Sequence, residues 1–444
     1  MSNATFNLRF KQILVTAIPH MLLMMSQSLI SIVDMLIVGN IGVTAIAAVG
    51  LCGFIFAVLT SGVTGIMISV QSVVGKKIGE GKPQSTVNAL HGALLVAIVV
   101  GSVITCSLFF IPWFIYLLID DPLLASNSIE YLQALVLAAP AIGVVRAFRG
   151  YFAGIGKNRF SLMVILSIYT ANILISYSLV SLGFGIKGAG LGTAISFYIG
   201  VLLFLACGFL VDKQYRFFKR VSITVHFKEI AKLSFYAGFQ QLFFSAGFAV
   251  MFIIASQIGA QSLAIVTVLN NLMLFSVMPL IGLGLASATF VSHSLGAKQN
   301  GEAKKWGNTA LAVGLTLCAL QLLILLIPQQ VLTLFLKDSA LVEKVLGLFQ
   351  LTVIFIFFEA FAQILKFAMF GAGYNRRIAR VTIALQWLLF IPGVYYLCIV
   401  KNQHIDVLWF CFLAYRAIEA LLIALMWQGE KWFFDSTKQA DIAK

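Results

Sequence analysis

Long apolar stretches separated by short polar segments follow one another along almost the whole chain. A helix of roughly 20 mainly apolar residues is long enough to cross a bilayer. Counting such stretches predicts twelve transmembrane helices, near residues 13–39, 46–72, 89–119, 129–153, 160–183, 188–212, 231–256, 262–291, 306–335, 345–371, 377–400 and 404–428. The connections between them are too short for a folded domain outside the membrane. We therefore predict an all-α integral membrane protein.

The composition supports this class and excludes others. Of the 444 residues, 61% are hydrophobic and 10% are charged. A soluble domain has about 45–50% apolar and about 25% charged residues. So few charges cannot cover the surface of a soluble enzyme or a nucleic-acid-binding protein. The high apolar content also excludes a disordered chain, which is poor in apolar residues. The net charge of +14 therefore indicates membrane orientation rather than an anionic partner, because lysine and arginine gather on the cytoplasmic side.

The distribution of the bases predicts the orientation. With the N-terminus inside, 25 of the 30 lysines and arginines fall at the inner face. Arg146, Arg149 and Lys366 are counted among them, and Lys366 lies close enough to the inner end of its helix to reach water. We expect a multi-pass protein of the plasma membrane, the bacterial inner membrane, with both termini in the cytoplasm.

The chain also contains an internal repeat. Residues that coincide at a spacing of 217 positions are Gly42 with Gly259, Gly65 with Gly282, Gly154 with Gly371, and Asn158 with Asn375. Each half then has six helices, so both halves enter the membrane from the same side. This predicts two six-helix lobes, residues 1–217 and 218–444, related by a pseudo-two-fold axis along the membrane normal. Secondary transporters use such an arrangement; the alternative is a duplicated scaffold without transport.

The first lobe has one acid within its predicted helices. A charged side chain in a bilayer is costly and indicates function. Gln27, Ser31 and Asp34 are spaced i, i+4, i+7 and therefore share a helix face. A desolvated carboxylate can take up a proton near neutral pH, and carboxylate and amide oxygens can instead hold a hard cation. Both coupling roles stay open, as does an aspartate that only fixes helix packing.

The second lobe has a different set of charges. Glu359 lies in the tenth predicted helix, with Phe358 beside it and Gln363 one turn further. These residues are expected to attract a cationic substrate or to form a second ion site, unless a neighbouring base neutralises Glu359. Arg416 and Glu419 are spaced i, i+3, which permits a structural ion pair on the twelfth helix.

Several of these landmarks resemble the multidrug and toxic compound extrusion (MATE) family. The residues that carry the resemblance are Pro19, Val33 and Asp34 in the first helix, residues 148–158 at the turn between helices 4 and 5, and residues 259–264, 282–284 and 296–297 in and after the eighth. The resemblance implies a V-shaped exporter with two six-helix lobes, driven by the influx of protons or sodium, whose substrates are amphipathic cations.

The resemblance also implies partners for Asp34. It places Asn172 and Ser176 near this acid, and Thr193 at a position that lines the same site. Two residues depart from the family pattern. Ser176 stands where the family often has aspartate, and Phe244 stands where an acid is common in the seventh helix. Only one carboxylate of the usual N-lobe pair is left.

We therefore predict an alternating-access antiporter that exports small, drug-like amphipathic compounds in exchange for H+ or Na+, and the family resemblance implies that these compounds are cationic. The sequence has no catalytic, metal-binding or nucleotide-binding constellation, so no enzyme activity and no cofactor beyond the coupling ion is expected. The expected partners are its substrate and the lipid bilayer. We expect no binding of nucleic acid, and we expect the protein to be a monomer. The alternative is a flippase for lipid-linked precursors, which needs a cationic cavity, whereas only Arg416 is expected to lie deep.

Overall fold

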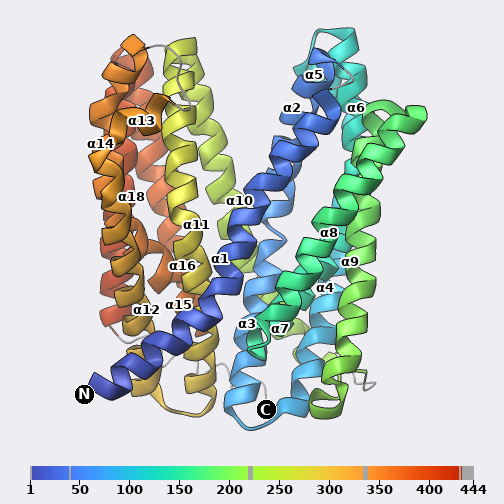
Figure 1. Ribbon diagram of the computed structural model, residues 1–444, viewed down its shortest axis with the longest axis vertical. Helices are drawn as coiled ribbons and strands as arrows, with labels where there is room; N and C mark the ends of the chain where they lie inside the picture. Colours follow the sequence, from blue (N-terminus) through green and yellow to red (C-terminus); the bar gives the residue numbers. More distant parts are fainter. Residues whose placement is uncertain (1–2, 40–41, 219–223, 334–338, 430–431, 433–444) are drawn as a thin grey trace. The chain divides into compact units, whose positions relative to one another are not determined.

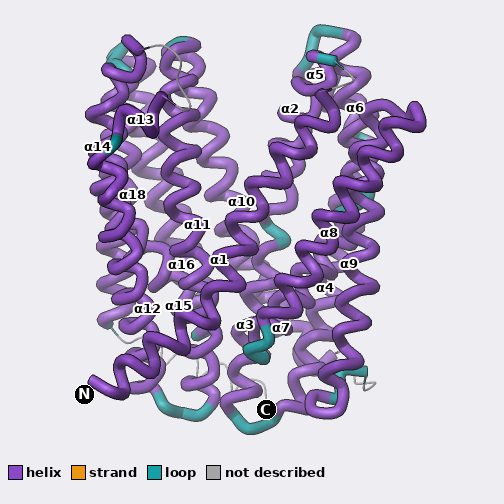
Figure 2. The backbone as a smooth tube through the Cα atoms, in the orientation of Figure 1, coloured by secondary structure: helices purple, strands orange, loops and turns teal. Residues whose placement is uncertain are grey.

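The computed structural model describes residues 3–39, 42–218, 224–333, 339–429 and 432. Side chains are described for these residues except at positions 3–5, 27–36, 43, 224–226, 260 and 339–341. Every regular element in this part of the chain is a helix (Figure 2), so the predicted all-α class is confirmed. The fold follows from the apolar stretches, because a helix satisfies its own backbone hydrogen bonds where water is absent.

The chain divides into two compact units. Unit 1 consists of Met1–Met21, Phe243–Leu295 and Gln299–Lys444, and unit 2 consists of Leu22–Leu242 and Gly296–Lys298. Two long helices are therefore divided between the units, namely α1 (Asn3–Gly39) and α10 (Thr224–Ile258), and Gly296, the last residue of α11, also belongs to unit 2. The predicted lobes, residues 1–217 and 218–444, stay a prediction.

Unit 2 contains the later part of α1, the beginning of α10 and the helices between them. These are α2 (Val43–Ser61), α3 (Thr64–Gly79), η1 (Pro83–Ser85), α4 (Thr86–Cys106), η2 (Ser107–Phe109), α5 (Ile111–Leu118), α6 (Pro122–Val136), α7 (Ala139–Gly154), α8 (Asn158–Leu179), η3 (Val180–Phe184) and α9 (Gly185–Tyr215). Helix α7 packs against α3, α4, α8 and α9. At Gly150 the backbones of α7 and α3 come so close that a Cβ atom would lie 2.4 Å from the Met67 carbonyl oxygen.

Unit 1 contains the beginning of α1, the later part of α10 and the rest of the chain. Its other helices are α11 (Ala260–Gly296), α12 (Asn300–Gln321), η4 (Leu322–Leu326), α13 (Pro328–Thr333), α14 (Ser339–Ala360), η5 (Phe361–Leu365), α15 (Lys366–Gly371), α16 (Asn375–Ala384), η6 (Leu385–Phe390), α17 (Ile391–Tyr395), η7 (Tyr396–Val400) and α18 (Ile405–Gln428). Its core includes the fully buried Trp409 and Phe412 of α18.

The repeat in the sequence is visible as a repeated contact. A Cβ atom at Gly154 of α7 would lie 3.1 Å from the carbonyl oxygen of Gln71 in α3. In unit 1, a Cβ atom at Gly371 of α15 would lie 2.4 Å from the carbonyl oxygen of Ala288 in α11. Both members of the second pair follow those of the first by 217 positions. The two units thus use the same glycine for the same close approach of helices.

Nine of the described helices are long and apolar enough to cross a membrane, or ten if the bent pair α6 and α7 is one span. One of the nine is the 58-residue stretch Asn158–Tyr215, which is longer than one crossing requires. It consists of α8 and α9, which lie side by side in Figure 1 and join where Gly183 has a positive φ of 86°. The predicted number of twelve spans stays a prediction.

Candidate functional site

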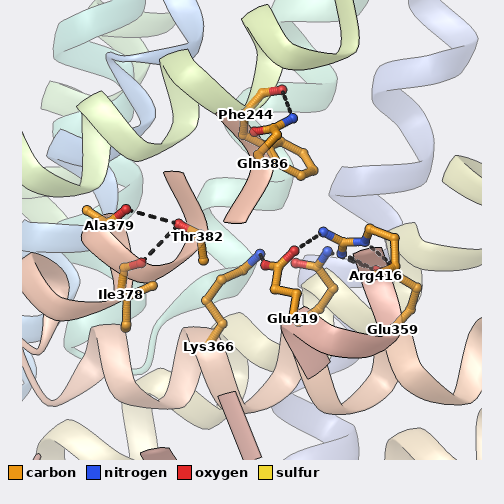
Figure 3. A network of polar contacts seen from close by, with 10 residues as sticks. Phe244, Glu359, Lys366, Ile378, Ala379, Thr382, Gln386, Arg416 and Glu419 are labelled. Carbon is orange, nitrogen blue, oxygen red and sulfur yellow. Dashed lines mark hydrogen bonds and ion pairs between the residues drawn. The ribbon is translucent and has the colours of Figure 1, made fainter. Parts of the chain in front are cut away.

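A buried polar cluster in unit 1 is centred on Arg416 of α18. Its guanidinium group donates to both carboxylate oxygens of Glu359 on α14, with Nη2 2.6 Å from Oε2, and a further nitrogen donates to Glu419 one turn along α18 (Figure 3). The sequence predicted the contact with Glu419 by its i, i+3 spacing. The structure adds Glu359 as a second partner from another helix.

Lys366 and Gln363 complete this cluster. The Nζ atom of Lys366 lies 3.5 Å from Oε1 of Glu419, and the Gln363 amide donates to Oε2 of Glu359 over 3.1 Å. The four charged residues are each at most 2% exposed. Two carboxylates therefore face two bases, and the cluster is neutral as a whole. The expectation that Lys366 reaches the membrane surface is wrong, because its side chain is buried and faces Glu419. A buried ammonium group needs such a nearby counter-charge.

Glu359 and Lys366 are seven positions apart, or about two helical turns, and both contact α18. Between them lies η5, a π-helical stretch of five residues. A π-helical turn is wider than an α-helical one, so it changes which side chains share a face, and such turns often occur at functional sites. Residues of η5 pack directly on α18. The sequence contained no signal for this turn.

An aromatic ring covers the two bases of the cluster. The centroid of Phe244 in α10 lies 5.5 Å from Cζ of Arg416 and 5.5 Å from Nζ of Lys366, which permits cation–π attraction to both. The Gln386 amide donates to the Phe244 carbonyl oxygen over 3.2 Å (Figure 3). By contrast, the structure does not bring the predicted Phe358 to the cluster. It is 40% exposed and packs against Phe355.

A second polar cluster in unit 2 joins three residues that the family resemblance placed together. The Asn172 amide of α8 donates to the Thr193 hydroxyl of α9 over 2.9 Å, and it lies 3.5 Å from the Ser176 hydroxyl. The absence of a side chain at Gly192 allows this approach, because a Cβ atom there would lie 2.2 Å from the Ser176 oxygen. The Oδ1 atom of Asn172 is buried and has no hydrogen-bond partner among the residues that the structure describes.

The α1 members of this predicted site are only partly covered by the structure. Gln27, Ser31 and Asp34 lie within the helical backbone of α1, in the part of this helix that belongs to unit 2. Their side chains lie outside the described residues. Their roles in the site stay predictions.

A third cluster consists of bases that the sequence placed at the inner surface. Arg146 is half-buried and Arg149 is 8% exposed, and both lie on α7. The expectation that only Arg416 lies deep is therefore wrong, because Arg149 and Lys366 are also buried. The repeat was the available signal for this burial. Arg149 and Lys366 are 217 positions apart, so they occupy equivalent positions in the two halves.

Comparisons with known proteins agree with the fold and the duplication. The family model MatE matches residues 19–178 and 237–396. The chain is 25% identical over 401 residues to a multidrug resistance protein NorM of Photobacterium profundum, covering 87% of each chain. It is 22% identical to a probable NorM of Bacillus cereus, covering 89% of each.

Two solved structures have the same fold. One is a MATE crystal structure in the bent conformation, with a TM-score of 0.87 and 19% identity, which covers 98% of this chain and 97% of that one. The other is the eukaryotic MATE transporter AtDTX14, with a TM-score of 0.86 and 17% identity, which covers 99% and 100%.

Proposed function

Because this chain belongs to the MatE family, whose model matches both of its halves, we propose that it is a multidrug efflux transporter of the cytoplasmic membrane. It exports amphipathic organic compounds by alternating access, in exchange for a proton or a sodium ion, and it is no enzyme. Relatives named multidrug resistance proteins, similar over 87% of the chain, support this proposal. Both termini are placed in the cytoplasm by the distribution of lysine and arginine.

The observation that carries the coupling mechanism is the acceptor oxygen of Asn172, which has no partner among the described side chains. A buried polar atom without a partner costs free energy, so Oδ1 of Asn172 is expected to bind a donor or a cation from outside the described residues. A protonated carboxyl group of Asp34 supplies a donor for it, and a sodium ion uses the same oxygen as a ligand. We therefore assign the coupling ion to Asp34, Asn172, Ser176 and Thr193. Gln27 and Ser31 flank Asp34 on the same face of α1.

The acid of the tenth predicted helix receives a different role. Both oxygens of Glu359 already accept hydrogen bonds from Arg416, and Gln363 donates to one of them. A guanidinium group thus takes the place that a substrate cation or a second coupling ion would need. We assign Glu359 and Gln363 to a closed structural cluster, and the expected preference for cations then rests on Asp34 alone.

The test is transport in liposomes with a proton or a sodium gradient imposed separately. Two dyes are followed, rhodamine B, which carries a carboxylate, and its ethyl ester, which is a cation. Asp34→Asn is expected to abolish gradient-driven movement of the dye that the wild type carries, while the protein keeps its elution volume in size-exclusion chromatography. The matched control is Asp120→Asn, because Asp120 is exposed and should leave transport unchanged.

The two gradients identify the ion. Wild-type transport with only one of them names that ion as the coupling ion. Unchanged transport by the Asp34→Asn variant would contradict the coupling site. Movement of neither dye under either gradient would contradict the antiporter itself.

A further inference from the structure

Arg146 and Arg149 of α7, which we call the basic pair, lie within unit 2. Arg146 and Arg149 are three positions apart, so they lie on one face of the helix. Helices α3, α4, α8 and α9 surround α7, and Arg149 is 8% exposed. The two guanidinium groups are close enough to repel each other electrostatically. Unit 2 thus holds two like charges in its interior.

The described neighbour of both guanidinium groups is a phenol. Tyr169 of α8 interacts electrostatically with Arg146 and Arg149, and its hydroxyl group also makes a hydrogen bond with Ser26 of α1. A neutral phenol supplies a dipole and an acceptor oxygen, but no negative charge. Side chains of three helices therefore meet at the basic pair, and the described ones among them, Tyr169 and Ser26, carry no negative charge.

Three carboxylates of unit 2 are engaged elsewhere. Glu80 pairs with Lys77, Asp121 caps the N-terminus of α6, and Asp212 accepts from the backbone of Phe218. Within the part of the chain that the structure describes, no carboxylate forms an ion pair with Arg146 or Arg149. The side chain of Asp34 is not described, but its position on α1 is eight residues beyond Ser26, or about 12 Å along the helix at 1.5 Å per residue.

A buried base without a counter-charge is costly, and such groups are normally paired or bound to a ligand. In unit 1 the protein provides this counter-charge itself, since Lys366 faces Glu419. In unit 2 none of the described side chains supplies this counter-charge, so a bound ligand is a candidate source. Arg146, Tyr169 and Ser26 are each half-buried, so the side of the pair that they form is partly exposed.

We propose that Arg146, Arg149 and Tyr169 form a subsite for an oxyanion, the carboxylate or phosphate group of an amphiphilic molecule. A guanidinium group matches the two oxygens of such a group with two parallel hydrogen bonds, and the Tyr169 hydroxyl adds a third donor. This inference rests on the proposed function and names its substrate class. The transported compounds then include zwitterions and amphiphilic acids rather than cations alone.

Binding of two dyes to the purified transporter in detergent, free of phospholipid, tests the subsite. Rhodamine B and its ethyl ester share one aromatic cation and differ in the free carboxylate. Fluorescence anisotropy is expected to show about tenfold or tighter binding of rhodamine B, as one charge-assisted contact provides. Arg149→Gln should remove this difference, and Arg149→Lys should restore part of it. Arg159→Gln is the matched control, because Arg159 is exposed on α8.

Dihexanoyl phosphatidylglycerol separates the two sources of the oxyanion. If it competes with rhodamine B only when Arg149 is present, a lipid phosphate also uses the subsite. If it binds in an Arg149-dependent way while the two dyes bind equally, the subsite is a lipid site. If neither the lipid nor rhodamine B depends on Arg149, the proposal is wrong.

Binding and transport fail separately. Arg149-dependent binding without movement of dye in liposomes would leave the subsite standing and contradict the exporter. Gradient-driven transport of both dyes with equal binding, unaffected by Arg149→Gln, would leave the exporter standing and contradict the subsite.

Discussion

The two units solve the same electrostatic problem in different ways. Lys366 in unit 1 and Arg149 in unit 2 are 217 positions apart, and each stands five residues before the glycine of the repeated helix contact. Lys366 lies against Glu419. Arg149 has only the phenol of Tyr169 as a described electrostatic partner apart from Arg146. Both units thus have a buried base at equivalent positions of the repeat, but among the described side chains only unit 1 supplies a counter-charge.

The neighbouring positions show where the units diverged. Glu359 of unit 1 corresponds to the buried Ile142 of unit 2, and Gln363 corresponds to Arg146. Unit 1 therefore carries a neutral, closed cluster, while the equivalent helix of unit 2 carries two bases and no acid. A closed cluster fixes helices to one another. An uncompensated pair is suited to recognise a ligand.

The largest expected effect comes from removing the centre of the unit 1 cluster. Arg416→Met leaves Glu359 and Glu419 buried with Lys366 as their remaining base, and breaking such a network costs about 3–5 kcal/mol. Denaturant titration in detergent micelles should show this loss of unfolding free energy. The control is Arg9→Met, whose pair with Glu302 is 2.6 Å long but partly exposed, and which should cost about 0–1 kcal/mol.

Two outcomes would decide the role of the cluster. Replacing all four members together with methionine should recover most of the lost stability, because no unpaired charge is left and the side chains are apolar and of similar size. A loss for Arg416→Met no larger than that for Arg9→Met would contradict a closed ionic cluster.

A smaller effect is expected at Lys366. After Lys366→Met, Glu419 keeps its contact with Arg416, so the loss is limited to about 1–3 kcal/mol, the cost of one buried partner. Lys305→Met is the control, because Lys305 lies closer to its carboxylate, 2.7 Å from Glu302, but its side chain is 45% exposed. If burial decides, the longer contact of Lys366 is worth more. The same titration measures both, and a larger loss at Lys305 would contradict this ranking.

The sequence predicted the helices well because their signal is local. An apolar stretch predicts a helix by itself, and the spacing of 217 positions identified Gly154 and Gly371 as equivalent positions, which the structure shows in equivalent contacts. The π-helical turn of η5 was not predictable, since it depends on how α14 and α18 pack. The contact of Lys366 with Glu419 depends on the same packing, and the sequence placed this lysine at the membrane surface.

The candidate sites were predicted where one helix was sufficient. The i, i+3 spacing of Arg416 and Glu419 gave their contact, whereas the partner that Glu359 uses lies 57 positions away. Phe244 was noted only as the absence of an acid. Its position over two bases becomes visible only when α10 and α18 are placed together. Burial of Arg149 was also missed. A base near a helix end is most often solvated, and only the packing of α7 against its neighbours shows that this one is not.

The smallest expected effect has the opposite sign and tests the comparison directly. Arg149→Met removes a buried charge that has no described counter-charge and keeps the apolar stem of the side chain. The ligand-free protein should therefore become more stable, by about 1 kcal/mol, because the desolvation penalty of the ion disappears. Denaturant titration without phospholipid, beside Lys366→Met, measures the two signs under one condition.

If Arg149→Met instead destabilises as much as Lys366→Met, Arg149 has a carboxylate partner within the chain. Asp34 is then the candidate, and the double variant Asp34→Asn/Arg149→Met would show a coupling energy of about 0.5–3 kcal/mol. A gain in stability together with the loss of oxyanion binding would show that unit 2 retains this charge for a ligand rather than for its own fold.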